Sequence, residues 1–304
     1  SCSDGRRWAA RLESVEADFD PIDRLWCRLV RADLAQGTAD HETGARSAAE
    51  AVQLAEQAGD ATALVIARQS DALHYVVIDP DEALARLDHA LEFAGSLDDP
   101  RLERLLRAFV SVTELSAGRT DRGMEIAEEV GHEATGDGYD VFIANWAAWT
   151  GCLIRGDAER LRYWRERQRT YLSSIAIPEP WMFLWSTALN HAMEGDDPIA
   201  GLRLARVRAD SEGHDIAADV ILAFVVIELL AGRGTEAAGL LGLAMRSRLN
   251  NLSHYVLART LRARLRESLD HDTLTAAMRR GAQWDAHEIL DARGISLGEP
   301  TAPA

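Results

Sequence analysis

The stretch that decides the fold is IELLAGRGTEAAGLL, residues 227–241, where an apolar run stops at Gly232 and an Ala- and Leu-rich run begins. A related stretch, TELSAGRTDRGMEI, occupies residues 113–126. Both contain Glu-Leu-x-Ala-Gly-Arg, over residues 114–119 and again over residues 228–233, which places the two copies 114 residues apart. Repetition of this kind indicates a repeated structural unit.

Glycines punctuate the sequence between the two copies. They lie at positions 118, 156, 195 and 232, so successive breaks are 38, 39 and 37 residues apart. Gly37 and the Asp79-Pro80 pair extend the series with less regular spacing. A fixed period of this size is typical of helical solenoids, and it is longer than the period of tetratricopeptide repeats, about 34 residues.

Each unit has two parts, an apolar helix before the break and an amphipathic helix after it. In residues 81–93, Leu84, Leu87 and Leu91 have the spacing of one inward-facing helical stripe. Glycine at the break can adopt the left-handed conformation that ends a helix, and Asp, Thr or Pro then starts the next one. One hairpin of this size cannot bury its apolar face alone, so stacked neighbours must bury it.

The sequence therefore predicts an all-α fold, a right-handed superhelical solenoid of about seven helix-turn-helix, tetratricopeptide-like repeats. We expect three parts along the chain. They are a lead-in segment over residues 1–20, the helical repeat domain over residues 21–295 and a disordered tail over residues 296–304.

Composition excludes several classes of function. The 304 residues carry a net charge of −16, and an acidic surface repels phosphates, so we expect no direct nucleic-acid contact and no membrane contact. All 33 basic side chains are arginine. Without lysine, this chain cannot form a Walker A nucleotide site, a kinase active site or a Schiff base.

Cysteine usage and hydropathy point to a cytoplasmic chain without cofactors. Cys2, Cys27 and Cys152 are far apart and form no CxxC, so we expect neither a zinc site nor a disulfide framework. The most apolar stretch, residues 221–230, is too short to span a bilayer and contains Glu228.

Aromatic residues are concentrated in one part of the chain, where five of the eight tryptophans lie between residues 146 and 185. Trp181 and Trp185 share a helix face, as do Asn145 and Trp149. If the first helices of consecutive repeats line a concave groove, these rings would lie near Asn145 and Asn190. Aromatic concave surface with a few amides suits a small molecule or a peptide.

The alternative is that these rings fill the core between repeats. Arg68 and His74, on earlier first helices, would add polar contacts to a binding site. The predicted ligand- or partner-binding residues are Arg68, His74, Asn145, Trp146, Trp149, Trp181, Trp185 and Asn190. We predict no catalytic residues and no metal ligands.

Three segments of the sequence, in their order along the chain, resemble a known family. ALVIARQSDALHYVVIDPDEALARLDHALEFAGSLDDPRLE, residues 63–103, is similar to the start of the tetratricopeptide-like arm of bacterial STAND-type ATPase regulators. These include large ATP-binding LuxR-type regulators and related cyclase- or kinase-linked sensors. PEPWMFLWSTALNHAMEGDDPIAGLRLA, residues 178–205, and LRARLRESLDHDTLTAAMRRGAQWDAHEILDARG, residues 261–294, resemble later parts of the same arm.

The resemblance covers about residues 22–295 and implies a sensor arm that takes part in inducer recognition. The family's ATPase module and helix-turn-helix are not found in this sequence. No ligand residues transfer, because the arm has no fixed ligand motif.

We therefore expect a non-enzymatic sensor and protein-interaction arm of a larger signalling or transcription regulator. It would bind a small-molecule inducer or a partner protein in its concave groove, and it would contact neighbouring domains of its parent protein. The alternative is a free-standing tetratricopeptide-like adaptor that binds a peptide or protein segment and no small molecule. An enzyme on a repeat scaffold is disfavoured by the absence of lysine and of any catalytic constellation.

Overall fold

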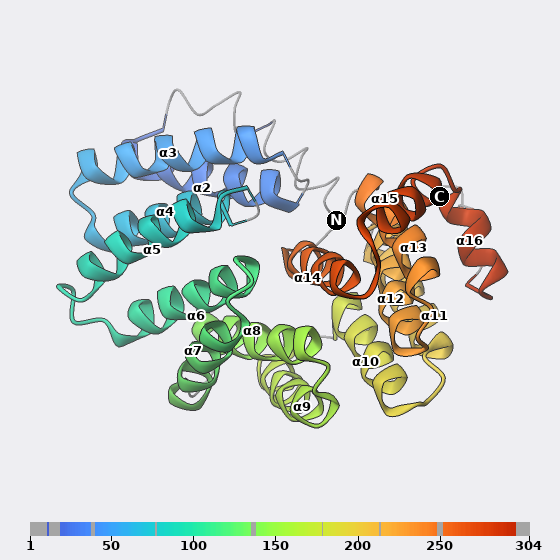
Figure 1. Ribbon diagram of the computed structural model, residues 1–304. Helices are drawn as coiled ribbons and strands as arrows, with labels where there is room; N and C mark the ends of the chain where they lie inside the picture. The colour runs from blue at the N-terminus through green and yellow to red at the C-terminus, as the bar shows by residue number, and fades with distance from the viewer. Residues whose placement is uncertain are drawn as a thin grey trace. The chain divides into compact units, whose positions relative to one another are not determined.

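The computed structural model describes residues 11, 19–37, 40–76, 78–134, 138–177, 179–212, 214–247 and 252–295. Over these residues the regular elements are all helices, which confirms the predicted all-α class (Figure 1). Most of the predicted lead-in, residues 1–10 and 12–18, and the whole predicted tail, residues 296–304, lie outside the described residues.

The chain divides into two compact units, residues 1–177 and residues 178–304. In the first unit, helices that follow one another in sequence pack together as hairpins. Its helices are α2 (Pro21–Gly37), α3 (His41–Ala58), α4 (Ala61–Leu73), α5 (Pro80–Ala94), α6 (Pro100–Ser116), α7 (Thr120–Glu133), α8 (Tyr139–Arg155) and α9 (Ala158–Ser174).

The second unit continues the alternation. Its helices are α10 (Trp181–Glu194), α11 (Ile199–Glu212), α12 (Ala217–Leu230), α13 (Gly234–Arg246), α14 (Leu252–Ser268), α15 (His271–Gly281) and α16 (Ala286–Ala292). In the part of the chain that is described, α2 to α15 follow one another as seven pairs of helices, as the repeat spacing predicts, and the first six pairs pack as hairpins. The single continuous domain over residues 21–295 stays a prediction.

Left-handed glycines mark the predicted breaks. Each of these residues has a positive φ and lies directly after a helix or one residue beyond it, where a side chain would be strained. Their φ angles are 82° at Gly118, 75° at Gly156, 87° at Gly195 and 74° at Gly232. The spacing of glycines in the sequence therefore located these turns correctly.

The repeated Glu-Leu-x-Ala-Gly-Arg phrase closes the turn with an ion pair. The main-chain N–H of Arg119 donates to the carbonyl of Glu114 at 2.9 Å, and that of Arg233 donates to the carbonyl of Glu228 at 2.8 Å. In both copies the arginine side chain returns to the same glutamate. Arg119 also contacts Asp81 of α5 at 2.9 Å, which links this turn to the preceding hairpin.

Aspartates start many of the helices, as the turn chemistry predicts. Their side chains accept hydrogen bonds from main-chain N–H groups in the first turn, which satisfies donors that the helix itself leaves free. The capping residues include Asp60 of α4, Asp79 of α5, Asp99 of α6, Asp157 of α9 and Asp270 of α15.

The last pair departs from the simple hairpin, because α15 packs mainly against α13 rather than against α14. Glycines allow this close approach. A Cβ added at Gly242 would lie 2.1 Å from the carbonyl oxygen of Met278, and one added at Gly281 would lie 1.8 Å from that of Gly239. The glycines of the GTEAAGLLG stretch therefore bring two helix backbones together in the second unit.

Candidate functional site

The predicted tryptophans lie within the packed interior of their units. In α8 of the first unit, Trp146 is 8% exposed and Trp149 is 1% exposed. In α10 of the second unit, Trp181 is 2% exposed and Trp185 is fully buried. These rings contribute to the core, and their role in ligand binding stays a prediction.

The rings of α10 surround a buried polar pair that the sequence analysis missed. Nδ1 of His254, on α14, lies 2.6 Å from Oδ1 of Asp219, on α12, and both side chains are almost completely buried. Trp185 donates from Nε1 to the main-chain oxygen of Asp219 at 2.8 Å, and its ring centroid lies 4.1 Å from that of His254. Trp181 contacts the same imidazole edge to face. This cluster joins three helices of the second unit.

His74 is also a packing residue. It is 2% exposed at the end of α4, and a Cβ at Gly44 of α3 would lie 2.1 Å from Cε1 of its ring. The imidazole therefore fills space against the backbone of α3. Gly44 is what permits this contact.

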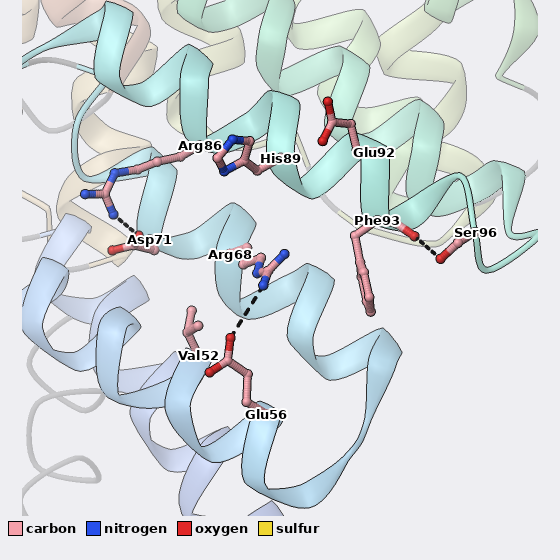
Figure 2. A pocket seen from close by; sticks show the side chains of 9 residues that line it. All are labelled: Val52, Glu56, Arg68, Asp71, Arg86, His89, Glu92, Phe93 and Ser96. Atoms are coloured by element: carbon pink, nitrogen blue, oxygen red, sulfur yellow. Dashed lines mark hydrogen bonds and ion pairs between the residues drawn. The ribbon is translucent and has the colours of Figure 1, made fainter.

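A surface pocket lies between α3, α4 and α5 in the first unit, with a volume of about 640 Å³ (Figure 2). Its titratable lining residues are Glu56, Arg68, Asp71, Arg86, His89 and Glu92. Val52, Phe93 and Ser96 complete the lining. Three carboxylates and two guanidinium groups therefore line one pocket, together with the aromatic ring of Phe93.

Two ion pairs organise the charges of this α3–α5 pocket. Arg68 contacts Glu56 at 3.4 Å and lies 5.5 Å from the ring centroid of Phe93. Arg86 pairs with Asp71. Burial raises the pKa of the Asp71 carboxyl, although the neighbouring Arg86 opposes this shift. Arg68 is the predicted binding residue that the structure places in this pocket.

A second pocket, of about 510 Å³, lies beside α8 and α9 in the same unit. Its polar lining residues are Asn145, Tyr163, Glu166, Arg167, Thr170 and Ser174, and Ala134, Val141 and Tyr171 complete it. Asn145 is the predicted binding residue found here. Asn190, on α10, is 2% exposed and lines neither pocket.

Within the described residues, no group of three or more His, Cys, Asp or Glu side chains is placed to hold a metal ion. Over the same part of the chain, none of the helices combines the length and the apolar character that crossing a bilayer requires.

The sequence carried little signal for the α3–α5 pocket. Arg86, His89 and Phe93 have helical spacing on the outer side of an amphipathic helix, a pattern that an ordinary solvated face also has. The pairing of Arg86 with Asp71 of α4 depends on how two helices pack, which residue spacing alone does not reveal.

No family model matches the chain, and no curated protein matches it either. Among solved structures, the crystal structure of a Rap protein complexed with Competence and Sporulation Factor is similar to this chain, with a TM-score of 0.55 and 17% sequence identity. The match covers 88% of this chain and 68% of the Rap chain. At this identity the likeness concerns the fold, and it supports the predicted tetratricopeptide-like helical repeat.

Proposed function

We propose that this chain is a non-enzymatic helical-repeat interaction domain that binds a segment of a partner protein in the α3–α5 pocket. The observation that carries the proposal is the mixed charge of that pocket, which three carboxylates, two arginines and Phe93 line together. Its volume of about 640 Å³ lies in the range of ligand-binding sites.

The charge pattern favours a polypeptide over a phosphorylated ligand. Arg68 and Arg86 are already paired with carboxylates, so a phosphate would have to displace them and would then face those carboxylates. A polypeptide that carries both acidic and basic side chains can pair its acidic groups with the two arginines and its basic groups with the carboxylates that they release. Phe93 offers apolar contact to the same segment.

The fold supports the same proposal. A Rap protein with a similar fold was solved in complex with Competence and Sporulation Factor, so an architecture of this kind is compatible with a bound factor. Helical repeats suit protein recognition because their side chains extend over a long, continuous surface.

We further propose, from the resemblance to STAND-type regulators, that the domain is the cytoplasmic sensor arm of a larger signalling or transcription regulator. A bound partner or small-molecule inducer that prefers one conformation of the repeats would shift the population toward it. The alternative is a free-standing adaptor. Sequencing the reading frame on both sides tests this: an ATPase module upstream supports the arm, and adjoining start and stop codons support the adaptor.

An array of random 12-residue peptides tests the binding function. We expect peptides of mixed charge to bind, and Arg68→Ala and Phe93→Ala to weaken the best of them by about tenfold each. Arg122→Ala is the matched control, because Arg122 forms an exposed ion pair with Glu125 on α7.

If no peptide of the array binds while a compound from a metabolite panel shifts the tryptophan emission, the chain binds a small-molecule inducer and the peptide proposal is wrong. If peptides bind but Arg68→Ala and Phe93→Ala have no effect, the α3–α5 pocket is not the site.

A further inference from the structure

The pocket beside α8 and α9 contains a buried polar atom without a partner. Asn145 is 1% exposed and lines this pocket, and its Oδ1 has no hydrogen-bond partner among the residues that the structure describes. A buried carbonyl oxygen of this kind costs free energy in the free chain, and native proteins satisfy almost all such groups.

The other polar groups of the α8–α9 pocket already have partners. Arg167 donates to the carbonyl of Gly131 at 2.7 Å and contacts the Tyr163 hydroxyl at 3.4 Å. Glu166 pairs with Arg169 at 2.7 Å. Both charged groups of the pocket are therefore held by contacts within the chain, Glu166 by an arginine and Arg167 by two neutral oxygens.

Hydroxyl groups of α9 are satisfied in the same way. Thr170 donates to the carbonyl of Glu166 at 3.0 Å, and Ser174 donates to that of Tyr171 at 2.7 Å. Oδ1 of Asn145 thus differs from the other hydrogen-bonding groups that line the pocket, although buried atoms of Trp149, Thr150 and Gln168 on α8 and α9 also have no partner among the described residues. It is an acceptor, so the group it lacks is a donor.

Aromatic rings extend from this pocket along α8. Tyr171, which lines the pocket, lies 6.2 Å from Phe142 between ring centroids, and Phe142 stacks on Tyr139 at 5.8 Å. Tyr139 is 58% exposed. A ligand that enters the pocket can therefore continue along an aromatic surface that starts at its edge, and such surface binds apolar side chains well.

We infer that the α8–α9 pocket binds a neutral, extended peptide segment, whose main-chain N–H donates to Asn145 Oδ1 while an apolar or aromatic side chain fills the pocket. The volume of about 510 Å³ lies within the range of small-ligand sites. The inference rests on the proposed function, that the chain binds polypeptides, and it adds a second binding site of different chemistry to the charged α3–α5 pocket.

The probe is a positional-scanning pool of N-acetyl tetrapeptide amides, which carry no terminal charge. We expect pools with one fixed apolar or aromatic residue to bind, and Asn145→Leu to weaken binding by about tenfold, the effect of losing one hydrogen bond. Asn190→Leu is the matched control, since Asn190 is a buried amide that lines neither pocket.

Replacing single amides of the best tetrapeptide by esters identifies the donor. One ester should weaken binding to the unmodified chain by about tenfold and should have no further effect on Asn145→Leu. If Asn145→Leu lowers the melting temperature sharply, Thr170→Trp replaces it, because Thr170 is exposed and a large ring there fills the pocket from outside.

The outcomes separate the two proposals. If tetrapeptides bind and only Arg68→Ala and Phe93→Ala abolish binding, the α8–α9 inference is wrong and the proposed function stands. If binding occurs but the ester scan gives no coupling to Asn145, the assigned hydrogen bond is wrong. If neither tetrapeptides nor the longer array peptides bind, both proposals are overturned.

Discussion

Asp219 in the second unit and Asn145 in the first are both buried polar side chains on helices that open a hairpin, and they differ in their partners. Asp219 is fully buried and lies 2.6 Å from His254. Asn145 is 1% exposed and its Oδ1 has no partner among the described residues. A polar group that the fold satisfies contributes to stability, whereas one that is left unsatisfied and also lines a pocket, as Asn145 does, can serve a ligand.

The largest effect that tests this comparison is expected at His254. His254→Leu leaves the buried carboxylate of Asp219 without its imidazole, which should lower the free energy of unfolding by about 3–5 kcal/mol. Chemical denaturation followed by tryptophan emission measures the loss. His89→Leu is the control, because His89 is exposed on α5 and its replacement should change stability by less than about 0.5 kcal/mol. Equal stability of both variants would show that the Asp219–His254 pair does not support the second unit.

A second test lies on the same helix as Asn145. Asp140, in the first turn of α8, is 4% exposed and contacts Arg104 of α6 at 2.8 Å. Arg104→Met should cost about 1.5–3 kcal/mol, the range for hydrogen bonds to a charged group, and thermal or urea unfolding measures it. Arg122→Met, at an exposed pair on α7, should show no measurable loss. If Arg104→Met does not change the stability, the buried carboxylate of Asp140 on α8 tolerates the loss of its partner. That result would weaken the argument for Asn145.

A third test concerns a feature that the two units share. Gly156 and Gly195 end α8 and α10 with φ angles of 75° and 87°, and a Cβ at either would meet no atom within 4 Å. Changing either to alanine should cost about 1–2 kcal/mol of stability, from backbone conformation alone. Gly95→Ala, where φ is −58°, should not destabilise the chain. Unequal losses at Gly156 and Gly195 would show that the repeated turn is not equivalent in the two units.

The turns were predictable because their chemistry is local. Glycine spacing located the left-handed residues, and aspartates before the helices located many of the starts. The repeated phrase also held the signal for its ion pair, since Glu114 and Arg119 recur with the same five-residue spacing as Glu228 and Arg233. Such pairs depend on one turn and not on the rest of the fold.

The polar groups of the interior were not predictable in the same way. Asp219 and His254 are 35 residues apart on different helices, so their contact exists only once α12 and α14 have packed. Helical spacing placed Trp181 and Trp185 on one face but did not reveal that this face is covered. Asn145 was predicted as a binding residue from its aromatic neighbours. The pocket and the unpartnered oxygen became visible only in three dimensions.

The smallest effect on stability is expected at Asn145 itself. Leucine has the same branched shape as asparagine and needs no hydrogen bond, and the adjoining pocket can take up its larger volume. Asn145→Leu should therefore leave the free energy of unfolding within about 0.5 kcal/mol or raise it. Denaturation midpoints measure this, with Asn190→Leu in the second unit as a parallel case, because its Oδ1 also has no partner among the described residues. A loss above about 1 kcal/mol in Asn145→Leu that Asn190→Leu does not share would indicate that the fold does use this amide, since a satisfied group is costly to remove. Unchanged stability together with lost peptide binding would show that Asn145, unlike Asp219, is a polar group that serves a ligand and not the fold.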